Sequence, residues 1–334
     1  MKPTTRNISA PDHLTDDDRI YFANHLERGR FFNPWQDVRP GGAIDLLKWQ
    51  LGSNPWKAEK RNEDPLEPVT DSLQRFNDLA SPKVLWIGHA SFLVEIDGFR
   101  ALIDPVFGGA SMFVPRKAPV PLEVEDLPHV DCVLITHGHY DHLDRTTLER
   151  LRDVQGADTT VVTPLGLGGV IPDGFERVLE IDWWTSVDFG GVEATLVPAQ
   201  HWHRRGLADT NKALWGGYAI QGSQTLYHSG DSGYFGGFQV IGEVFPEIEL
   251  AMLPVGAYEP RWFMRPQHMN PEESLAAFDD LGAAQFVAMH WGTFDLTDEP
   301  LRQGADRLER LVREQERIAS RFHLPPPGGS VAIK

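Results

Sequence analysis

Short apolar runs separated by polar turns recur from residue 83 to residue 289. Runs of this length bounded by turn residues are typical of β-strands. Two of them flank Asp97-Gly98, a dipeptide typical of a two-residue hairpin turn. We expect strands at 83–87, 91–96, 99–103, 131–136, 159–163, 192–198, 214–221, 224–229, 249–254 and 285–289.

Three segments between or after these runs predict helices, at 144–154, 271–281 and 299–320. The second has Asn270 as its cap, Pro271 at its first position and two glutamates in its first turn. Because strands are interleaved with helices, we predict an α/β fold built as a layered sandwich.

The first 80 residues have a different pattern. Pro, Asp, Asn and Trp are frequent there, and strand-like alternation is scarce. Residues 14–28 predict a helix with Thr15 as its cap, and we expect the rest of the segment to form an extended layer. We therefore divide the chain into an N-terminal extension packed on the core, 1–80, and a main domain, 81–334.

Composition narrows the class of protein. The chain has 334 residues, of which 41% are hydrophobic and 24% charged, as in ordinary globular proteins. It has no run of 18 apolar residues, so we expect no integral membrane segment. Cys132, the single cysteine, is expected to be a core residue. The start lacks the apolar core of a secretory signal, which favours a cytoplasmic location.

The net charge of the chain indicates which kinds of binding partner are expected. The formal charge of −17 argues against nucleic acid. A local cationic pocket for one phosphate remains compatible with it, and a homo-oligomer is left open.

The densest chemistry lies in His137-Gly138-His139-Tyr140-Asp141-His142, directly after the expected strand 131–136. Neutral imidazole and carboxylate are good ligands for zinc and similar divalent metals. His137 and His139 can face one metal, while the turn after them can direct Asp141 and His142 to a second. The alternative is a solvated polar turn, but four ligand-type residues directly after an apolar strand favour a metal site.

Three further ligand-type residues follow expected strands: His201, Asp231 and His290. Strand ends can meet at one rim of a sandwich, so these residues can converge on one site. A carboxylate at Asp231 can bridge two cations roughly 3.5–4 Å apart. Each has an alternative: His290 could be a core histidine, Asp231 a turn residue, and His203 competes with His201.

In motif and order, these residues resemble the metallo-β-lactamase superfamily. The resemblance is closer still to the family of N-acyl phosphatidylethanolamine-hydrolysing phospholipase D and its bacterial relatives. This resemblance extends from about residue 29 to about residue 295. The supporting segments are Gly29–Trp35, Trp86-Ile87-Gly88-His89-Ala90, Ile103–Phe107, Thr136, Pro198–Trp202, Gly230–Tyr234, Gly256–Met264, Gln267-His268 and Pro271–Glu273.

The resemblance implies a four-layered αβ/βα sandwich, the metallo-β-lactamase fold, with two Zn²⁺ ions per chain in domain 81–334. One zinc would take His137, His139 and His201. The other would take Asp141, His142 and His290, with Asp231 as the bridge. Within Gln200-His201-Trp202 the match falls on His201, which decides against His203.

The resemblance also implies an activity, a phosphodiesterase acting on a phospholipid-like substrate. Two cations supply a nucleophilic hydroxide and stabilise the charge that develops on a phosphoryl oxygen. Asp141 and His268 are the implied catalytic residues, and Asp104 is a candidate partner that orients a ligand histidine. The candidate substrate-binding residues are Tyr258, Arg261, Trp262 and Gln267. The basic loop 115–119 is also expected to face the site.

Alternatives remain for the function and for these residues. A lactonase or carboxylic esterase resembling ascorbate 6-phosphate lactonase would use the same metal motif, and a non-enzymatic metal-binding protein is a third class. The long match at 256–264 favours the phosphodiesterase with a small-molecule or lipid substrate. His268 could instead be a surface histidine, Asp104 a structural Asp-Pro turn, and the aromatic run 258–264 core packing.

Overall fold

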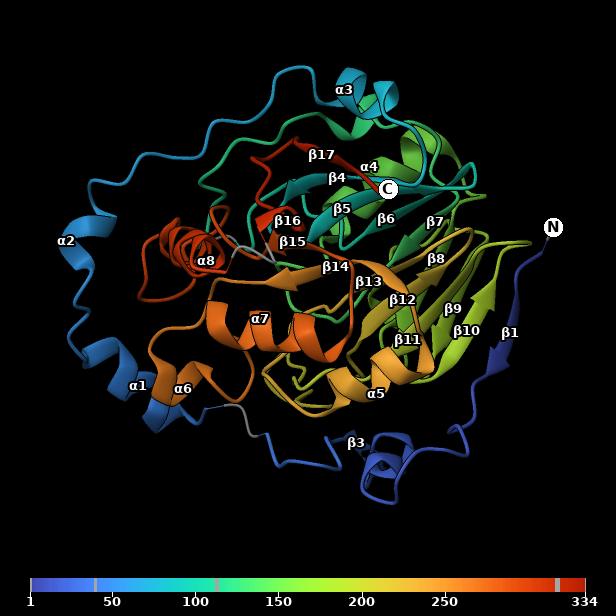
Figure 1. Cartoon of the computed structure of the whole chain (residues 1–334), viewed down its shortest axis with the longest axis horizontal. Helices are drawn as coiled ribbons and strands as arrows, with labels where there is room; N and C mark the ends of the chain where they lie inside the picture. Colours follow the sequence, from blue (N-terminus) through green and yellow to red (C-terminus); the bar gives the residue numbers. More distant parts are fainter. Residues whose placement is uncertain (1, 39–40, 112–113, 316–318, 334) are drawn as a thin grey trace.

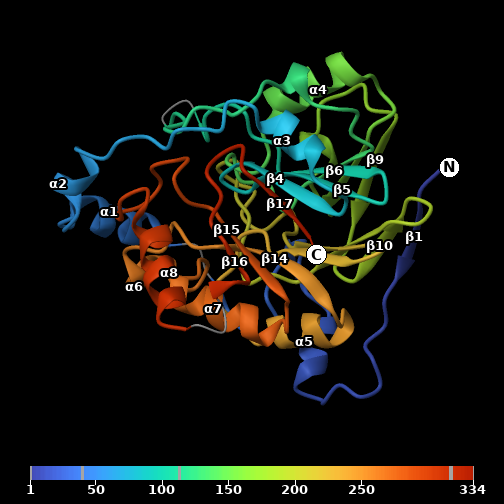
Figure 2. The same cartoon turned by 45° about the horizontal axis from the view of Figure 1, so that its top comes forward.

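The computed structural model describes residues 2–38, 41–111, 114–315 and 319–333. Two mixed β-sheets pack face to face, and helices cover their outer faces, as Figures 1 and 2 show. The predicted αβ/βα sandwich is therefore confirmed.

One sheet has seven strands in the order β17-β4-β5-β6-β7-β8-β9. Pairing is antiparallel from β17 to β6 and parallel from β6 to β9. The strands are β4 (Lys83–Gly88), β5 (Ser91–Ile96), β6 (Phe99–Ile103), β7 (Cys132–Leu134), β8 (Thr160–Pro164), β9 (Arg177–Ile181) and β17 (Ser330–Ala332).

The other sheet has eight strands in the order β1-β10-β11-β12-β13-β14-β15-β16. Pairing is antiparallel from β1 to β13 and parallel from β13 to β16. The strands are β1 (Thr4–Asn7), β10 (Thr185–Asp188), β11 (Glu193–Val197), β12 (Gly217–Gln221), β13 (Thr225–His228), β14 (Ile248–Pro254), β15 (Gln285–Met289) and β16 (Phe322–His323).

Helices α3 (Ser72–Asp78) and α4 (Arg145–Gln155) lie outside the seven-stranded sheet. Helices α5 (Gly237–Val244), α7 (Pro271–Asp280) and α8 (Gln303–Arg313) lie outside the eight-stranded sheet (Figure 2). The α7 helix begins as predicted, because Asn270 Oδ1 accepts a hydrogen bond from the Glu273 amide at 2.9 Å.

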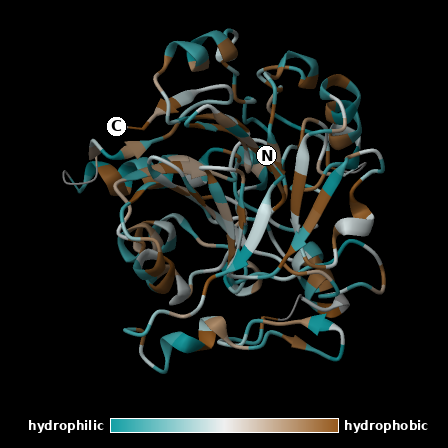
Figure 3. Ribbon diagram, turned by 90° about the vertical axis from the view of Figure 1, so that its right-hand side faces the viewer, coloured by the Kyte–Doolittle hydropathy of each residue, from teal (hydrophilic) through white to brown (hydrophobic). Residues whose placement is uncertain are grey.

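Strand β4 shows that the sheet is covered on both faces. Alternate side chains of a strand point to opposite faces of a sheet, and all six residues of β4 are buried. Trp86 points into the core between the sheets, whereas Leu85 and Ile87 join the core under the outer helices. Figure 3 shows hydrophobic residues along the strands of both sheets.

The predicted helix at 14–28 is wrong. Thr15 Oγ1 does accept a hydrogen bond from the Asp18 amide, but only a short 3₁₀ turn, Asp18–Phe22, follows. The chain then forms the hairpin β2 (Leu26–Glu27) and β3 (Arg30–Phe31). The backbone is already extended at Ala23, with ψ of 164°, and Arg28 and Gly29 link the two strands in a left-handed conformation, with φ of 52° and 72°.

The expected extended layer contains helices α1 (Ala43–Leu51) and α2 (Lys57–Lys60) besides α3. The N-terminal segment also contributes β1 to the eight-stranded sheet. The division of the chain near residue 80 stays a prediction.

Several boundaries differ from the sequence prediction. Strands β1, β9, β10, β16 and β17 and helices α5 and α6 (Arg261–Met264) were not predicted. The helix predicted at 299–320 begins only at Gln303, and the Glu63 carboxylate accepts hydrogen bonds from the amides of Leu301 and Arg302 just before it. The structure assigns this helix as far as Arg313, and residues 316–318 of the predicted range lie outside the described residues.

Candidate metal centre

The ends of several strands deliver ligand-type side chains to one rim of the sandwich. The motif at 137–142 follows β7, His201 follows β11, Asp231 follows β13 and His290 follows β15. Strands β13, β14 and β15 are parallel, so their carboxyl ends lie at the same edge. All the residues predicted as metal ligands come together at this rim.

The first group contains His137, His139, His201 and Asp231. His139 Nδ1 lies 3.0 Å from His137 Nε2 and 3.1 Å from His201 Nε2. Ligand nitrogens around a tetrahedral zinc, with Zn–N bonds of about 2.0–2.1 Å, lie about 3.4 Å apart. Burial lowers the pKa of His139 to about 4 and holds the pKa values of His137 and His201 well below their usual range. These rings are therefore neutral, the form that binds a metal.

The second group contains Asp141, His142 and His290, with Asp231 beside them. Asp231 Oδ2 lies 3.2 Å from His142 Nε2, and Asp231 Oδ1 lies 3.0 Å from His290 Nε2. Asp231 Oδ2 is also 3.8 Å from His137 Nε2 and 3.9 Å from His201 Nε2. The Asp231 carboxylate therefore stands between the two groups.

Three atoms of this second group are buried without a hydrogen-bond partner: His142 Nε2, His290 Nε2 and Asp231 Oδ1. Buried polar atoms are normally satisfied, so three that converge on one point indicate a missing partner. A divalent cation satisfies all of them at once. The donor set and its geometry thus fit a metal in both groups.

The charges of the centre point the same way. Burial would raise the pKa of Asp231, but the neighbouring His142 and His290 lower it well below its usual range. Burial would likewise lower the pKa of His142, but the carboxylates of Asp231, Asp104 and Asp141 raise it well above its usual range. Such an arrangement attracts positive charge, which a bound metal supplies with release of a proton.

Hydrogen bonds to the Nδ1 atoms of the candidate ligand histidines fix the orientation of their imidazole rings. Asp104 Oδ2 lies 2.7 Å from His142 Nδ1, and the Thr136 amide donates to Asp104 Oδ1 at 2.7 Å. His137 Nδ1 lies 3.0 Å from Thr136 Oγ1, and His201 Nδ1 lies 3.2 Å from the Gln267 carbonyl oxygen. These bonds leave each Nε2 directed at the centre. Asp104 therefore contacts a candidate ligand histidine and is more than a turn residue.

A model of the β-lactamase superfamily domain matches residues 100–291, more than half of the chain. The chain belongs to the metallo-β-lactamase superfamily. It is 33% identical to N-acyl-phosphatidylethanolamine-hydrolyzing phospholipase D 1 of Caenorhabditis elegans, over 94% of this chain and 93% of that protein. It is also 33% identical to a metal-dependent hydrolase of Methanopyrus kandleri, over 70% of this chain and 92% of the relative.

A solved structure shares the fold. A metallo hydrolase of Ignicoccus hospitalis matches with a TM-score of 0.57 and 24% identity, covering 75% of this chain and 97% of that one. The protein is thus a metal-dependent hydrolase of the metallo-β-lactamase superfamily. None of the helices in the described part of the chain combines the length and the apolar composition that a transmembrane span requires.

Two histidines near the superfamily motif differ in their surroundings. His268 lies beside the centre, with Nδ1 3.9 Å from Asp231 Oδ2, and burial lowers its pKa to about 4. His203 instead packs against Gly138, and its amide donates to Asn211 Oδ1 at 3.0 Å. The structure thus places His201, and not His203, among the converging residues.

Two of the predicted substrate-binding side chains contact the protein itself. Tyr258 is fully buried, and its hydroxyl donates to Gln303 Oε1 at 2.7 Å, so it does not line a groove. Arg261 pairs with Glu273 at 2.7 Å and donates to the His268 carbonyl oxygen at 2.9 Å. We interpret both as support for the segment that carries His268.

The remaining predicted contacts fall into two kinds. Gln267 is buried and meets His201 through its backbone, whereas the exposed Trp262 packs under Lys48 of α1. The loop 115–119 does not send its arginine into the site. Arg116 instead donates to the carbonyl oxygens of Ile87 and Val106, because buried carbonyls at these strand ends require a donor.

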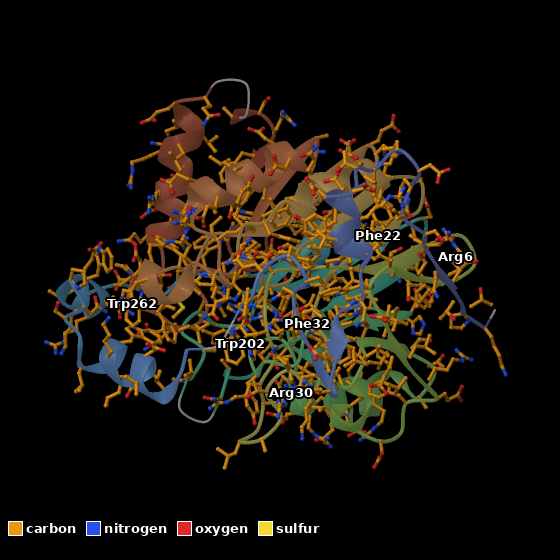
Figure 4. All side chains as sticks on the ribbon, turned by 90° about the horizontal axis from the view of Figure 1, so that it is seen from below. Arg6, Phe22, Arg30, Phe32, Trp202 and Trp262 are labelled. Carbon is orange, nitrogen blue, oxygen red and sulfur yellow. The ribbon has the colours of Figure 1, made fainter. Side chains whose placement is uncertain are left out.

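An open pocket of about 390 Å³ leads away from the metal centre. His139 and Asp141 lie in its wall, and much of the remaining lining is apolar: Leu46, Ala110, Val114, Trp202, Phe263 and Leu296. Figure 4 views the face with α1, where Trp262 lies beside that helix and Trp202 lies nearer the middle. The pocket joins polar ligands to an apolar wall, as a site for an amphipathic substrate requires.

His89 joins Asp141, His142 and His290 in a group of converging ligand atoms, a role that was not predicted from the sequence. A lone histidine in the turn between two strands carries little information by itself. The only indication in the sequence that His89 belongs to the site was its position in the segment 86–90, one of the segments that support the family resemblance.

Proposed function

We propose that this protein is a dinuclear zinc-dependent phosphodiesterase, of the N-acyl phosphatidylethanolamine phospholipase D type, acting on a phospholipid-like substrate. The observation that carries the proposal is the position of Asp231. Its Oδ1 lies 3.0 Å from His290 Nε2, and its Oδ2 lies 3.2 Å from His142 Nε2 and 3.8 Å from His137 Nε2, so this one carboxylate reaches histidines of both groups, as a carboxylate that bridges two metals must.

The side chains around the centre have distinct tasks in this proposal. Two zinc ions bound there would lower the pKa of a water molecule and polarise a phosphoryl oxygen. Asp231 would set the separation of the two ions, while Asp104 holds His142 in one orientation. Asp141 would serve as a ligand and face the reacting atoms from the pocket wall.

His268 is the proposed proton-handling residue. Its ring is neutral because burial lowers its pKa, so it has one N–H donor and one acceptor nitrogen. We propose that it binds a phosphoryl oxygen or assists the leaving oxygen. Arg261, Tyr258 and Gln267 hold its segment in place through the contacts described above.

The apolar pocket supports the lipid part of the proposal. Leu46, Trp202 and Phe263 can pack against an acyl chain, while Arg204 in the same pocket offers a guanidinium for a phosphate. The relative from Caenorhabditis elegans is named for the hydrolysis of N-acyl-phosphatidylethanolamine, a phospholipid with acyl chains and a phosphate. An acyl phospholipid would therefore place its headgroup at the metals and its chain along the pocket.

The test is a comparison of substrates with the purified, zinc-loaded protein. We expect hydrolysis of N-acyl phosphatidylethanolamine and of an aryl phosphodiester, and close to two equivalents of zinc by elemental analysis. Turnover of lactones or carboxylic esters without phosphodiester turnover would support the esterase alternative. Two bound metals without hydrolysis of any of these substrates would support a binding protein.

A further inference from the structure

His89 occupies a strained turn that the structure holds firmly in place. It lies between β4 and β5 with φ of 53°, after Gly88 with φ of 131°, and its side chain is only 2% exposed. A side chain at Gly88 would collide with Arg116, which binds the carbonyl oxygen of Ile87. Strain of this kind persists only where the surroundings enforce it, and it is common at functional sites.

The backbone of His89 is tied to the segment that carries His290. The His89 amide donates to Thr293 Oγ1 at 2.7 Å, and its carbonyl oxygen accepts from the His290 amide at 2.9 Å. The two imidazoles also pack together, with ring centroids 3.9 Å apart. Because a shift of His89 would move His290, the turn belongs to the frame of the metal centre.

The His89 ring reaches the Asp141 carboxylate. His89 Nε2 lies 3.1 Å from Asp141 Oδ2, and the same oxygen is 3.9 Å from the Nε2 atoms of His142 and His290. An ionised carboxylate only accepts hydrogen bonds, so His89 Nε2 must carry the proton. A protonated nitrogen has no lone pair for a metal, which makes His89 a donor to the ligand and not a ligand itself.

We propose that His89 is a positioning residue for the second metal subsite, where it donates Nε2–H to Asp141 and holds that carboxylate toward His142 and His290. This inference rests on the proposed dinuclear function. Asp141 lies in the wall of the open pocket, with 15% of its side chain exposed, so its carboxylate needs a fixed partner to keep one orientation. Partners of this kind typically change metal affinity or activity by about 10–100-fold.

The experiment compares metal binding by the wild type, His89→Ala and His89→Gln. We expect His89→Ala to weaken binding of the second metal by about 10–100-fold while the first stays near wild-type affinity. His89→Gln should restore most of that affinity, because a glutamine side chain can place an amide N–H near the position of Nε2. Affinities come from competition with a chelator, and Co²⁺ absorption spectra report the coordination of each site.

His25→Ala is the matched control. His25 Nε2 also meets a carboxylate, that of Asp182 at 2.7 Å, but this pair lies outside the groups of converging ligands. We expect its metal content, Co²⁺ spectrum and kcat to equal those of the wild type. Circular dichroism spectra confirm that each variant is folded.

Two results would overturn the inference while the proposed function stands. In one, His89→Ala binds both metals with wild-type affinity. In the other, His89→Gln remains as defective as His89→Ala and its Co²⁺ spectrum shows a lower coordination number, which would make His89 a ligand. Failure of the proposed function is distinct, because the wild type itself would then lack two metals or phosphodiester turnover.

Discussion

The Asp104 carboxylate lies 2.7 Å from His142 Nδ1, with both side chains fully buried. Asp104 also accepts hydrogen bonds from the amide and hydroxyl of Thr136, directly before the ligand motif. It therefore connects the carboxyl end of β6 to Thr136 and His142 of the metal centre. A buried carboxylate with this many hydrogen-bond partners has a fixed orientation and keeps His142 Nε2 directed at Asp231.

Asp104→Asn should lower kcat/KM by about 10–100-fold. The side-chain amide of asparagine has only one acceptor atom, its oxygen, so either Thr136 or His142 would lose its hydrogen-bond acceptor. Steady-state hydrolysis of an aryl phosphodiester measures the effect, with zinc content determined on the same sample. Asp153→Asn on α4, where 67% of the side chain is exposed, is the control and should behave as the wild type. Unchanged kcat/KM in Asp104→Asn would contradict the orienting role.

Asp231→Asn and His139→Ala should each lose nearly all hydrolysis while the fold survives. Asp231 faces both groups of histidines, so removing its charge disturbs both metals, whereas His139 belongs to the first group alone. Elemental analysis should therefore show a loss of both metals in Asp231→Asn and mainly of one in His139→Ala. Wild-type turnover in either variant would show that the ligand set is misassigned.

Much of the centre could be predicted from the sequence because its ligands are either consecutive, as at 137–142, or placed directly after apolar strands. The fold followed from the same alternation of strands and helices. His89 escaped prediction since its partner Asp141 lies 52 residues further on, and only the packing of the β4–β5 turn against Thr293 brings them together.

The aromatic run 258–264 shows a second limit. Its composition suits both a substrate groove and core packing, and the structure places one part of the run in the core and another in the wall of a pocket. Tyr258 is buried against Gln303, 45 residues away, whereas Phe263 lines the pocket. The helix predicted at 14–28 failed for a local reason, because the backbone becomes extended at Ala23, with ψ of 164°, directly after the short 3₁₀ turn.

His268→Ala should reduce kcat by roughly 10²–10⁴-fold with little change in KM, the range expected for loss of a proton-transfer group. The ring lies 3.9 Å from Asp231 and converges with Asp231 and His290, but the seven residues predicted as ligands supply both metal subsites without it. Zinc content should therefore stay near two equivalents. A variant that retains both metals and full kcat would exclude His268 from the reaction.

The metal-free protein should lose stability as the pH falls from 7 to 5. His228 is buried as a neutral ring, with Nε2 3.0 Å from the Ala90 carbonyl oxygen and Nδ1 accepting from the Gly230 amide. Burial lowers its pKa from 6.5 to about 4 in the folded state. Between these values the unfolded chain binds more protons, so folding weakens with acidification, by about 2 kcal/mol for this group between pH 7 and 5.

Urea unfolding of His228→Gln at both pH values isolates this contribution. The loss of unfolding free energy between pH 7 and 5 should shrink by about that amount relative to the wild type. An equal loss in His228→Gln and the wild type would contradict the assignment.

Substrate preference should depend on the apolar pocket beside the metals. Leu46 of α1 and Phe263 of α6 line it together with His139 and Asp141, so an acyl chain held there is continuous with the reacting headgroup. Leu46→Ser and Phe263→Ala should raise KM for a long-chain N-acyl phospholipid several-fold and leave KM for a short aryl phosphodiester unchanged, because only the long chain reaches the altered wall.

Leu26→Ser is the control for these two variants. It replaces an exposed leucine of the β2–β3 hairpin and should affect neither substrate. If the two pocket variants weaken both substrates equally, the pocket shapes the metal centre and does not bind an acyl chain. If they weaken neither, the chain lies elsewhere on the surface and the lipid part of the proposed function fails.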